Sequence, residues 1–122
     1  MDFEDLLDRI MDLDENIRHA RICDMNANVV SSRKRVGVVN FLTEEETAES
    51  LRYSVNSWKV RSKLAQKIGR GMYVLAVYEK LRRITMPLGD NHLLLVSIDN
   101  KGGQMDIIEK LQNELHGDYT HY

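Results

Sequence analysis

The stretch TEEETAESLRYSVNSWKVRSKLAQKIG, residues 43–69, carries helix signals at both of its ends. Thr43 is followed three residues later by Glu46, which is the spacing of a capping box. Three consecutive glutamates lie at the positive end of the helix dipole, and lysines lie near the negative end. Gly69 is suited to the left-handed conformation that often ends a helix. These signals predict one long central helix, around which the rest of the chain is arranged.

Two apolar stripes run along this predicted helix. The first recurs at intervals of three and four residues and comprises Ala48, Leu51, Val55 and Trp58. The second comprises Tyr53, Val60, Leu64 and Ile68. A surface helix needs only one apolar face to pack on a sheet. The second stripe is therefore either part of a wide core face or a contact between subunits, because contiguous exposed apolar area usually serves binding.

Length and composition indicate one globular domain over residues 1–122. Apolar residues make up 43% and charged residues 30% of the chain, and no apolar run approaches the roughly 20 residues of a membrane span. The acidic N-terminus is unlike a signal peptide, so we expect the cytoplasm and no membrane partner. The single cysteine, Cys23, has no intramolecular disulfide partner and is expected to be a small core residue. Residues 117–122 are expected to form a flexible tail.

Charge is segregated along the chain, although the formal net charge is only −2. The first 16 residues are acidic, whereas residues 57–85 are strongly basic. A basic segment can mark a site for a polyanion. Charges spread at helical spacing more often form a solvated face, so we do not expect nucleic-acid binding.

The remaining pattern predicts two further helices and five strands. The helices are expected at residues 2–14 and 104–116, where apolar residues recur at helical spacing. The strands are expected at 17–24, 29–32, 72–78, 82–88 and 92–98. A polar, basic loop is expected over 31–37. Segment 92–98 is the most hydrophobic and should lie at the centre of the sheet, while 72–78 should be buried on both faces or lie at an interface.

This order of elements, α-β-β-α-β-β-β-α, predicts an α+β fold. Hairpins joined across the central helix would form a five-stranded antiparallel sheet, with the long helix on one face and the terminal helices on the other. The expected architecture is a three-layer α/β/α sandwich. In the first strand, alternation places Ala20 and Ile22 on one face and His19, Arg21 and Cys23 on the other.

The short DMNANVV hairpin, the long capped helix and the meander MYVLAVYEKLRRITMPLGDNHLLLVSID together resemble the roadblock family of dynein light chains, over nearly the whole chain. The resemblance implies a profilin-like and longin-like fold. The order of elements and motifs from Ile68-Gly69 to Leu88 also resembles that of small single-domain proteins of ammonia-oxidising archaea. The resemblance implies a non-enzymatic homodimer that pairs the central helix and the following strand with those of a second copy. It also implies, as a partner, a small Ras-like GTPase or another signalling protein.

Candidate interaction residues follow from these patterns. The expected dimer interface joins the second helix stripe to the following strand and comprises Tyr53, Val60, Leu64, Ile68, Tyr73, Val74, Ala76 and Tyr78. Basic residues in loops or at strand edges are candidates for binding a partner: Arg33, Lys34, Arg35, Arg82 and Arg83. Charged residues also protect strand edges from association, which is the alternative interpretation.

No catalytic, cofactor or metal site is expected. The segment Gly69-Arg70-Gly71 lacks the remaining glycines and the Lys-Ser/Thr pair of a P-loop, and the histidines have no partner at metal-binding spacing. We expect no metal, flavin or nucleotide to copurify.

Two functions of different classes remain open: an interaction scaffold, and a PAS-like sensor that holds a small molecule between the sheet and the central helix. A sensor should contain a cavity of ligand size. A scaffold should have an interior filled by Leu51, Val55, Trp58, Leu75 and Leu94.

Overall fold

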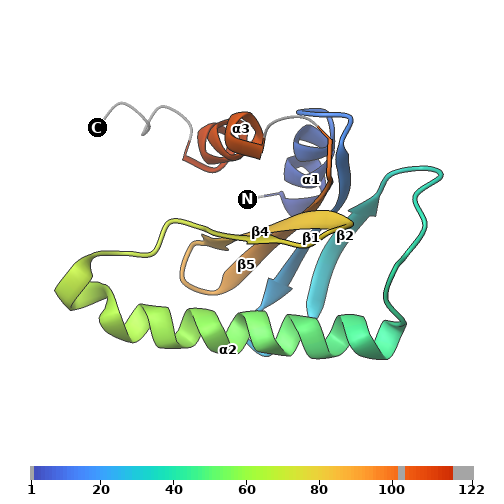
Figure 1. Cartoon of the computed structure of the whole chain (residues 1–122). Coiled ribbons are helices and arrows are strands. Elements are labelled where there is room, and N and C mark those ends of the chain that lie inside the picture. The colour runs from blue at the N-terminus through green and yellow to red at the C-terminus, as the bar shows by residue number, and fades with distance from the viewer. Residues whose placement is uncertain (1, 102–103, 117–122) are drawn as a thin grey trace.

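The computed structural model describes residues 2–101 and 104–116, which contain three helices and five strands (Figure 1). The helices are α1 (Phe3–Met11), α2 (Glu44–Ile68) and α3 (Gln104–His116). The strands are β1 (Ile17–Asp24), β2 (Val29–Lys34), β3 (Val74–Val77), β4 (Leu81–Leu88) and β5 (His92–Asp99). This order confirms the predicted α+β fold. The predicted tail, 117–122, lies outside the described residues.

The five strands form one antiparallel sheet in the order β2-β1-β5-β4-β3. β5 lies in the middle of this sheet, as its apolar composition predicts. α1 and α3 cover one face, and α2 runs across the other (Figure 1). The predicted three-layer arrangement is therefore confirmed. In the part of the chain that the structure describes, no helix has the length and apolar character needed to cross a membrane.

The face beneath α1 and α3 holds the larger apolar core. α1 contributes Leu6, Leu7 and Ile10, none of which is exposed. Ala20 and Ile22 of β1 point to this side, as the alternation predicts. The other buried members are Ile17, Ile84, Met86, Leu88, Leu94, Val96, Ile98, Ile107, Ile108 and Leu111. Because side chains from five elements meet here, this core holds the terminal helices on the sheet.

α2 contacts the opposite face through a small cluster centred on Trp58. The Trp58 ring packs with Cys23 and Leu93, which confirms the predicted core position of Cys23. Its indole Nε1 donates a hydrogen bond to Oγ1 of Thr85 at 2.8 Å. A Cβ at position 71 would lie 2.7 Å from the Trp58 ring, so Gly71 allows the chain after α2 to pass close to it.

Both ends of α2 carry the predicted signals, although one conformation differs. Thr43 Oγ1 accepts from the Glu46 amide, and the Glu46 carboxylate accepts from the Thr43 amide, which completes the capping box. Gly69 has φ 93° and ψ 167°. This is a region that glycine favours, but it is not the left-handed helical conformation, so that detail of the prediction is wrong. The chain leaves the helix in an extended direction toward β3.

Several element boundaries differ from the prediction. α1 ends at Met11 rather than at residue 14. β2 continues to Lys34, so the predicted basic loop starts too early, because Arg33 and Lys34 pair with β1. β3 spans only Val74–Val77, the residues that pair with β4, and lies at the edge of the sheet. Its residues are half-buried or exposed, so the first of the two expectations for this strand, burial on both faces, is wrong. The second, a place at an interface, stays a prediction.

Candidate functional site

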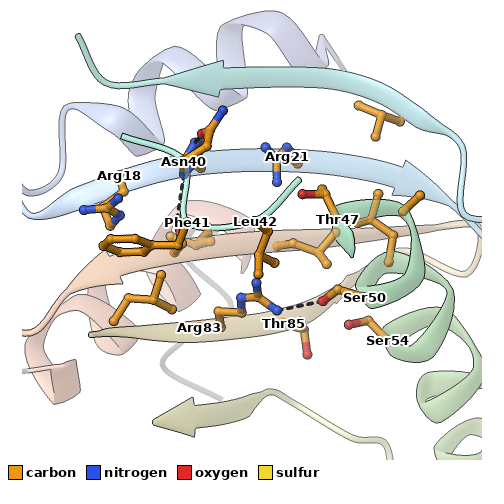
Figure 2. A pocket seen from close by; sticks show the side chains of 18 of the residues that line it. Arg18, Arg21, Asn40, Phe41, Leu42, Thr47, Ser50, Ser54, Arg83 and Thr85 are labelled. Atoms are coloured by element: carbon orange, nitrogen blue, oxygen red, sulfur yellow. Dashed lines mark hydrogen bonds between the residues drawn. The ribbon is translucent and has the colours of Figure 1, made fainter. Parts of the chain in front are cut away.

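A pocket of about 610 Å³ opens between the sheet and the N-terminal half of α2 (Figure 2). Strands β1, β4 and β5, helix α2 and the segment that precedes α2 all line it. Small-molecule sites typically have volumes of roughly 300–1,000 Å³. The space between α2 and the sheet is therefore large enough for a small ligand.

Polar side chains make up a large part of the pocket wall, where a helix and a sheet usually bury apolar side chains. Five polar residues reach it from three adjacent strands: His19, Arg21, Arg83, Thr85 and Ser97. The ladder pairs His19 with Ser97 and Ser97 with Arg83, which places them in one row on the same face. α2 adds hydroxyls at intervals of three and four residues from Thr47, Ser50 and Ser54.

Arg18 lines the pocket, and both terminal nitrogens of its guanidinium are bonded within the fold. Its guanidinium donates to Asp99 Oδ1 at 2.7 Å and to the Val39 carbonyl oxygen at 2.6 Å. The same group stacks on the ring of Phe41, 4.6 Å from the ring centroid. A buried charge is tolerated when it is paired in this way. Arg18 therefore holds the segment before α2 against the sheet.

Arg21 and Arg83 differ from Arg18, because neither has a carboxylate partner among the described residues. Arg83 donates to the Ser50 hydroxyl at 2.6 Å. The side chain of Arg21 forms no hydrogen bond or ion pair with the residues that the structure describes, 2–101 and 104–116. Burial, and then the charge of Arg83, lower the pKa of Arg21 below its usual value. The pocket thus holds two half-buried cations close enough to repel each other.

His19 lines the same pocket, and the hydrogen bonds of both ring nitrogens fix the tautomer of its neutral form. Its Nε2 is 3.0 Å from Oδ1 of Asn40, which can only accept, so Nε2 carries the proton. Its Nδ1 then accepts from the Ser97 hydroxyl, also at 3.0 Å. Burial, followed by the charge of Arg21, lowers the pKa of His19 below its usual value. A protonated His19 would add a third unpaired cation to the pocket.

Two of the predicted partner-binding residues make contacts within the fold. Arg33 forms ion pairs with Glu4 and Asp8 of α1. Arg35 donates to three backbone carbonyl oxygens between α1 and the start of β1, those of Met11, Asp14 and Ile17. These contacts join α1 to the β1–β2 hairpin. Both residues therefore have structural partners.

The other three predicted basic residues lie apart from one another. Lys34 is exposed at the end of the edge strand β2. Arg82 donates to the Asp99 carbonyl oxygen at 3.4 Å. It points to the face opposite Arg83, because the two residues are adjacent on β4. Only Arg83 reaches the pocket. The structure therefore does not bring the five basic residues together on one surface.

The predicted dimer residues lie in two groups. The helix stripe is exposed, with fractional exposures of 74% for Tyr53, 56% for Val60, 46% for Leu64 and 80% for Ile68. At 3.6 residues per turn, these positions lie on the side of α2 roughly opposite Leu51, which faces the sheet. The strand group is less exposed: Tyr73, Val74 and Ala76 are half-buried, and Tyr78 is 54% exposed.

The residues expected to fill a scaffold interior lie on both sides of the sheet. Leu51, Val55 and Trp58 are buried on the α2 side. Leu94 and Leu75 instead belong to the core beneath α1 and α3. The α2 side consequently has too few apolar side chains to fill it, which leaves the pocket.

The sequence matches no family model and no curated protein. Solved structures are similar in fold. A structure of the gliding protein MglB from Thermus thermophilus gives a TM-score of 0.72 at 11% identity, covering 97% of this chain and 88% of that one. A roadblock/LC7 domain from Streptomyces avermitilis gives 0.71 at 11% identity over all of both chains. The chain has the roadblock/LC7 fold. MglB from Myxococcus xanthus is also similar, with 0.68 at 18% identity over 98% of this chain and 95% of that one.

The roadblock/LC7 fold confirms the predicted resemblance at the level of architecture. At these identities the fold assigns no role to individual side chains. The polar lining of the pocket is therefore interpreted from the residues of this chain alone.

The sequence pattern predicted no role for the pocket residues Arg18, Arg21 and Ser50. A signal was present, since His19-x-Arg21 and Arg83-x-Thr85 place polar side chains at alternate positions of predicted strands. The hydroxyls of α2 recur beside its first apolar stripe. What the sequence could not supply was the register that brings these strands and the helix face together.

Proposed function

We propose that this roadblock-fold chain is a non-enzymatic interaction module: a cytoplasmic homodimer that serves as a partner or regulator of a small Ras-like GTPase or another signalling protein. The observation that carries the proposal is the exposed apolar stripe of α2, together with the open edge of β3 in the described sheet. Both features need a covering surface. A second copy of the chain, related by a two-fold axis, would cover both the stripe and the strand edge.

The edge of the sheet supports this assembly. β3 pairs with β4 on one side and has no strand on its other side within the described residues. Val77 is 61% exposed and Tyr78 is 54% exposed at its end. An open edge of apolar residues promotes pairing with another chain. Antiparallel pairing of two β3 strands would extend the sheet across both copies.

The α2 stripe supplies the apolar area that strand pairing lacks. A lasting contact should bury upwards of roughly 1,000 Å² in total, more than a four-residue strand provides. The stripe runs over four turns of α2, from Tyr53 to Ile68, and is not covered by the sheet. One solved structure with the same fold is described as MglB with a tetrameric arrangement, at a TM-score of 0.68 and 13% identity. Self-association is thus a property of at least one protein with this fold.

The proposed assembly is tested by adding charge to the stripe. Val60→Glu combined with Leu64→Glu would bury two unpaired carboxylates per subunit at the interface, so monomers are expected. Ser62→Glu combined with Gln66→Glu is the matched control, because it adds the same charge with the same spacing at exposed polar positions away from the stripe. Light scattering at micromolar concentration measures the mass. A single-chain mass for the unmodified protein would refute the homodimer.

The partner-binding role of the basic residues stays a proposal, and Lys34 is the residue best suited to test it. Lys34 is exposed, so Lys34→Glu should leave the fold intact. Reduced binding of a purified small Ras-like GTPase to this variant would support the role. Unchanged binding would exclude Lys34 from the contact.

A second candidate function, a PAS-like small-molecule sensor, is favoured by one observation. The pocket of about 610 Å³ lies between the sheet and α2, which is where such a ligand was expected. The two functions are compatible, since the pocket and the exposed stripe lie on different sides of α2. A ligand in the pocket could then influence the surface that α2 presents.

A further inference from the structure

We propose that the pocket between α2 and the sheet binds a small organic oxyanion, a carboxylate or a phosphate ester with an apolar body, and that Arg21 and Arg83 bind its charged group. This proposal rests on the second candidate function, because it names the ligand class of the same pocket. It is independent of the proposed homodimer.

The pocket carries an excess of positive charge. Three arginines line it, and in the described part of the chain Glu44 is the one carboxylate among its lining residues. The charge of Arg18 is already offset by Asp99. Arg21 and Arg83 remain without a carboxylate in a space partly screened from water. An oxyanion between them would form charge-assisted hydrogen bonds, which are about twice as strong as neutral ones.

The absence of a partner distinguishes Arg21 from the structural arginines of this fold. Arg33 has two carboxylate partners and Arg35 has three carbonyl partners. Each of those side chains joins two elements. Arg21 joins none within the described residues, and its location beside Arg83 is unfavourable without a counter-charge. Such an arrangement is typical of a site prepared for a ligand rather than of a core contact.

Two neighbouring hydroxyls have a hydrogen left to donate to the same ligand. Ser50 Oγ accepts from Arg83, and Thr85 Oγ1 accepts from the Trp58 indole. Each hydroxyl therefore keeps its own hydrogen for another acceptor. Figure 2 shows Arg21, Arg83 and Ser50 around one common space. Two guanidinium groups and two hydroxyl donors then face a ligand that only accepts.

The apolar part of the lining determines the rest of the ligand class. Phe41, Leu42 and Leu81 line the pocket together with the polar residues. Inorganic phosphate or sulfate would leave this apolar surface and most of the volume unused. An aromatic or branched body attached to the oxyanion would occupy both.

The test uses small probes in charged and neutral pairs on the full ¹⁵N-labelled chain. Benzoate is paired with benzamide, and phenyl phosphate with phenol. Probes of this size should bind with Kd on the order of 1 mM, which an NMR titration measures. We expect both anions, and neither neutral analogue, to shift the Arg21 and Arg83 side-chain signals and to raise the pKa of His19. Comparison of benzoate with phenyl phosphate shows whether the pocket prefers a carboxylate or a phosphate.

Variants separate recognition from folding. Arg21→Met and Arg83→Gln should each weaken binding of the anions by roughly tenfold or more. Arg82→Gln is the matched control, since it removes the same charge from the adjacent residue on the other face, and it should leave affinity unchanged. Arg21→Met should also leave the melting temperature unchanged or raise it, because it removes a repelled cation. If Arg21 had a structural role, this substitution would lower the melting temperature.

The outcomes are distinguishable. Binding of benzamide and phenol in the pocket with the same affinity as the anions would overturn the oxyanion class but keep a ligand pocket. If no probe shifts any protein signal at a probe concentration of tens of millimolar, both the ligand class and the sensor function are wrong. If an acidic side chain of a second copy filled the site, the Arg21 and Arg83 signals would depend on protein concentration instead of probe, and the proposal would be wrong. The probe results do not affect the light-scattering test of the homodimer.

Discussion

The face of the sheet beneath α1 and α3 is filled by apolar side chains, whereas the face beneath α2 has a small cluster at Trp58 beside a polar pocket of about 610 Å³. The same three strands, β1, β4 and β5, supply both faces. Consecutive residues therefore serve different purposes: Leu94 fills the core, and Leu95 lines the pocket. The comparison suggests that one face supplies most of the stability and leaves the other free to bind.

The largest expected effect compares these two adjacent leucines. Leu94→Ala should lower the free energy of unfolding by about 3–4 kcal/mol, because it leaves a cavity in a closed core. Leu95→Ala should cost only about 1 kcal/mol, since Leu95 is half-buried beside open space. Urea denaturation of both variants measures the difference. Equal losses would mean that the α2 face is packed as tightly as the other.

A second comparison separates adjacent basic residues at the end of β2. Arg35→Ser should cost about 2 kcal/mol, because three carbonyl oxygens between α1 and β1 lose a charged donor. Lys34→Ser should change stability by no more than about 0.5 kcal/mol. Thermal unfolding of the two variants checks this. If the Arg35 variant were as stable as the unmodified protein, that residue would be free for a partner.

The sequence predicted most of the architecture because local signals and apolar periodicity agree in the long elements. The Thr43–Glu46 capping box, the alternation of Ala20 and Ile22 and the central strand β5 were all readable. The roles of Arg33 and Arg35 were not, because their partners lie on α1 and at the start of β1, across tertiary contacts. The sequence predicted a ligand pocket only as one of two alternatives and did not identify its polar residues. These residues come from four separate elements, and the sequence does not encode locally the register that brings them together.

A third prediction concerns the small cluster that holds α2. Gly71→Ala should cost about 1–2 kcal/mol, because the added Cβ would meet the Trp58 ring at 2.7 Å. Trp58→Phe should lower the free energy of unfolding by less in the Gly71→Ala variant than in the unmodified protein, since the smaller ring relieves the clash. A double-mutant cycle measured by denaturation gives the coupling. Additive losses would show that the contact between α2 and the following segment adapts without strain.

The smallest expected effect is a pH dependence that comes from the pocket face alone. The folded chain lowers the pKa of His19 below the usual 6.5, through burial and then the charge of Arg21, with Arg18 and Lys34 also nearby. The unfolded chain therefore binds this proton more readily. The contribution to stability is complete above pH 6.5 and is lost as the pH falls through the lowered folded value.

Unfolding measured at several pH values between about 7.5 and 5.5 should show this loss in the unmodified protein and a smaller one in His19→Gln, which cannot titrate. The difference between the two proteins isolates His19 from the other ionisable groups. Saturating benzoate should reduce the difference, because an anion beside Arg21 favours the protonated imidazole. If the two proteins lose stability in parallel, His19 does not sense the cations of the pocket, and the charge contrast between the two faces has no energetic consequence at this residue.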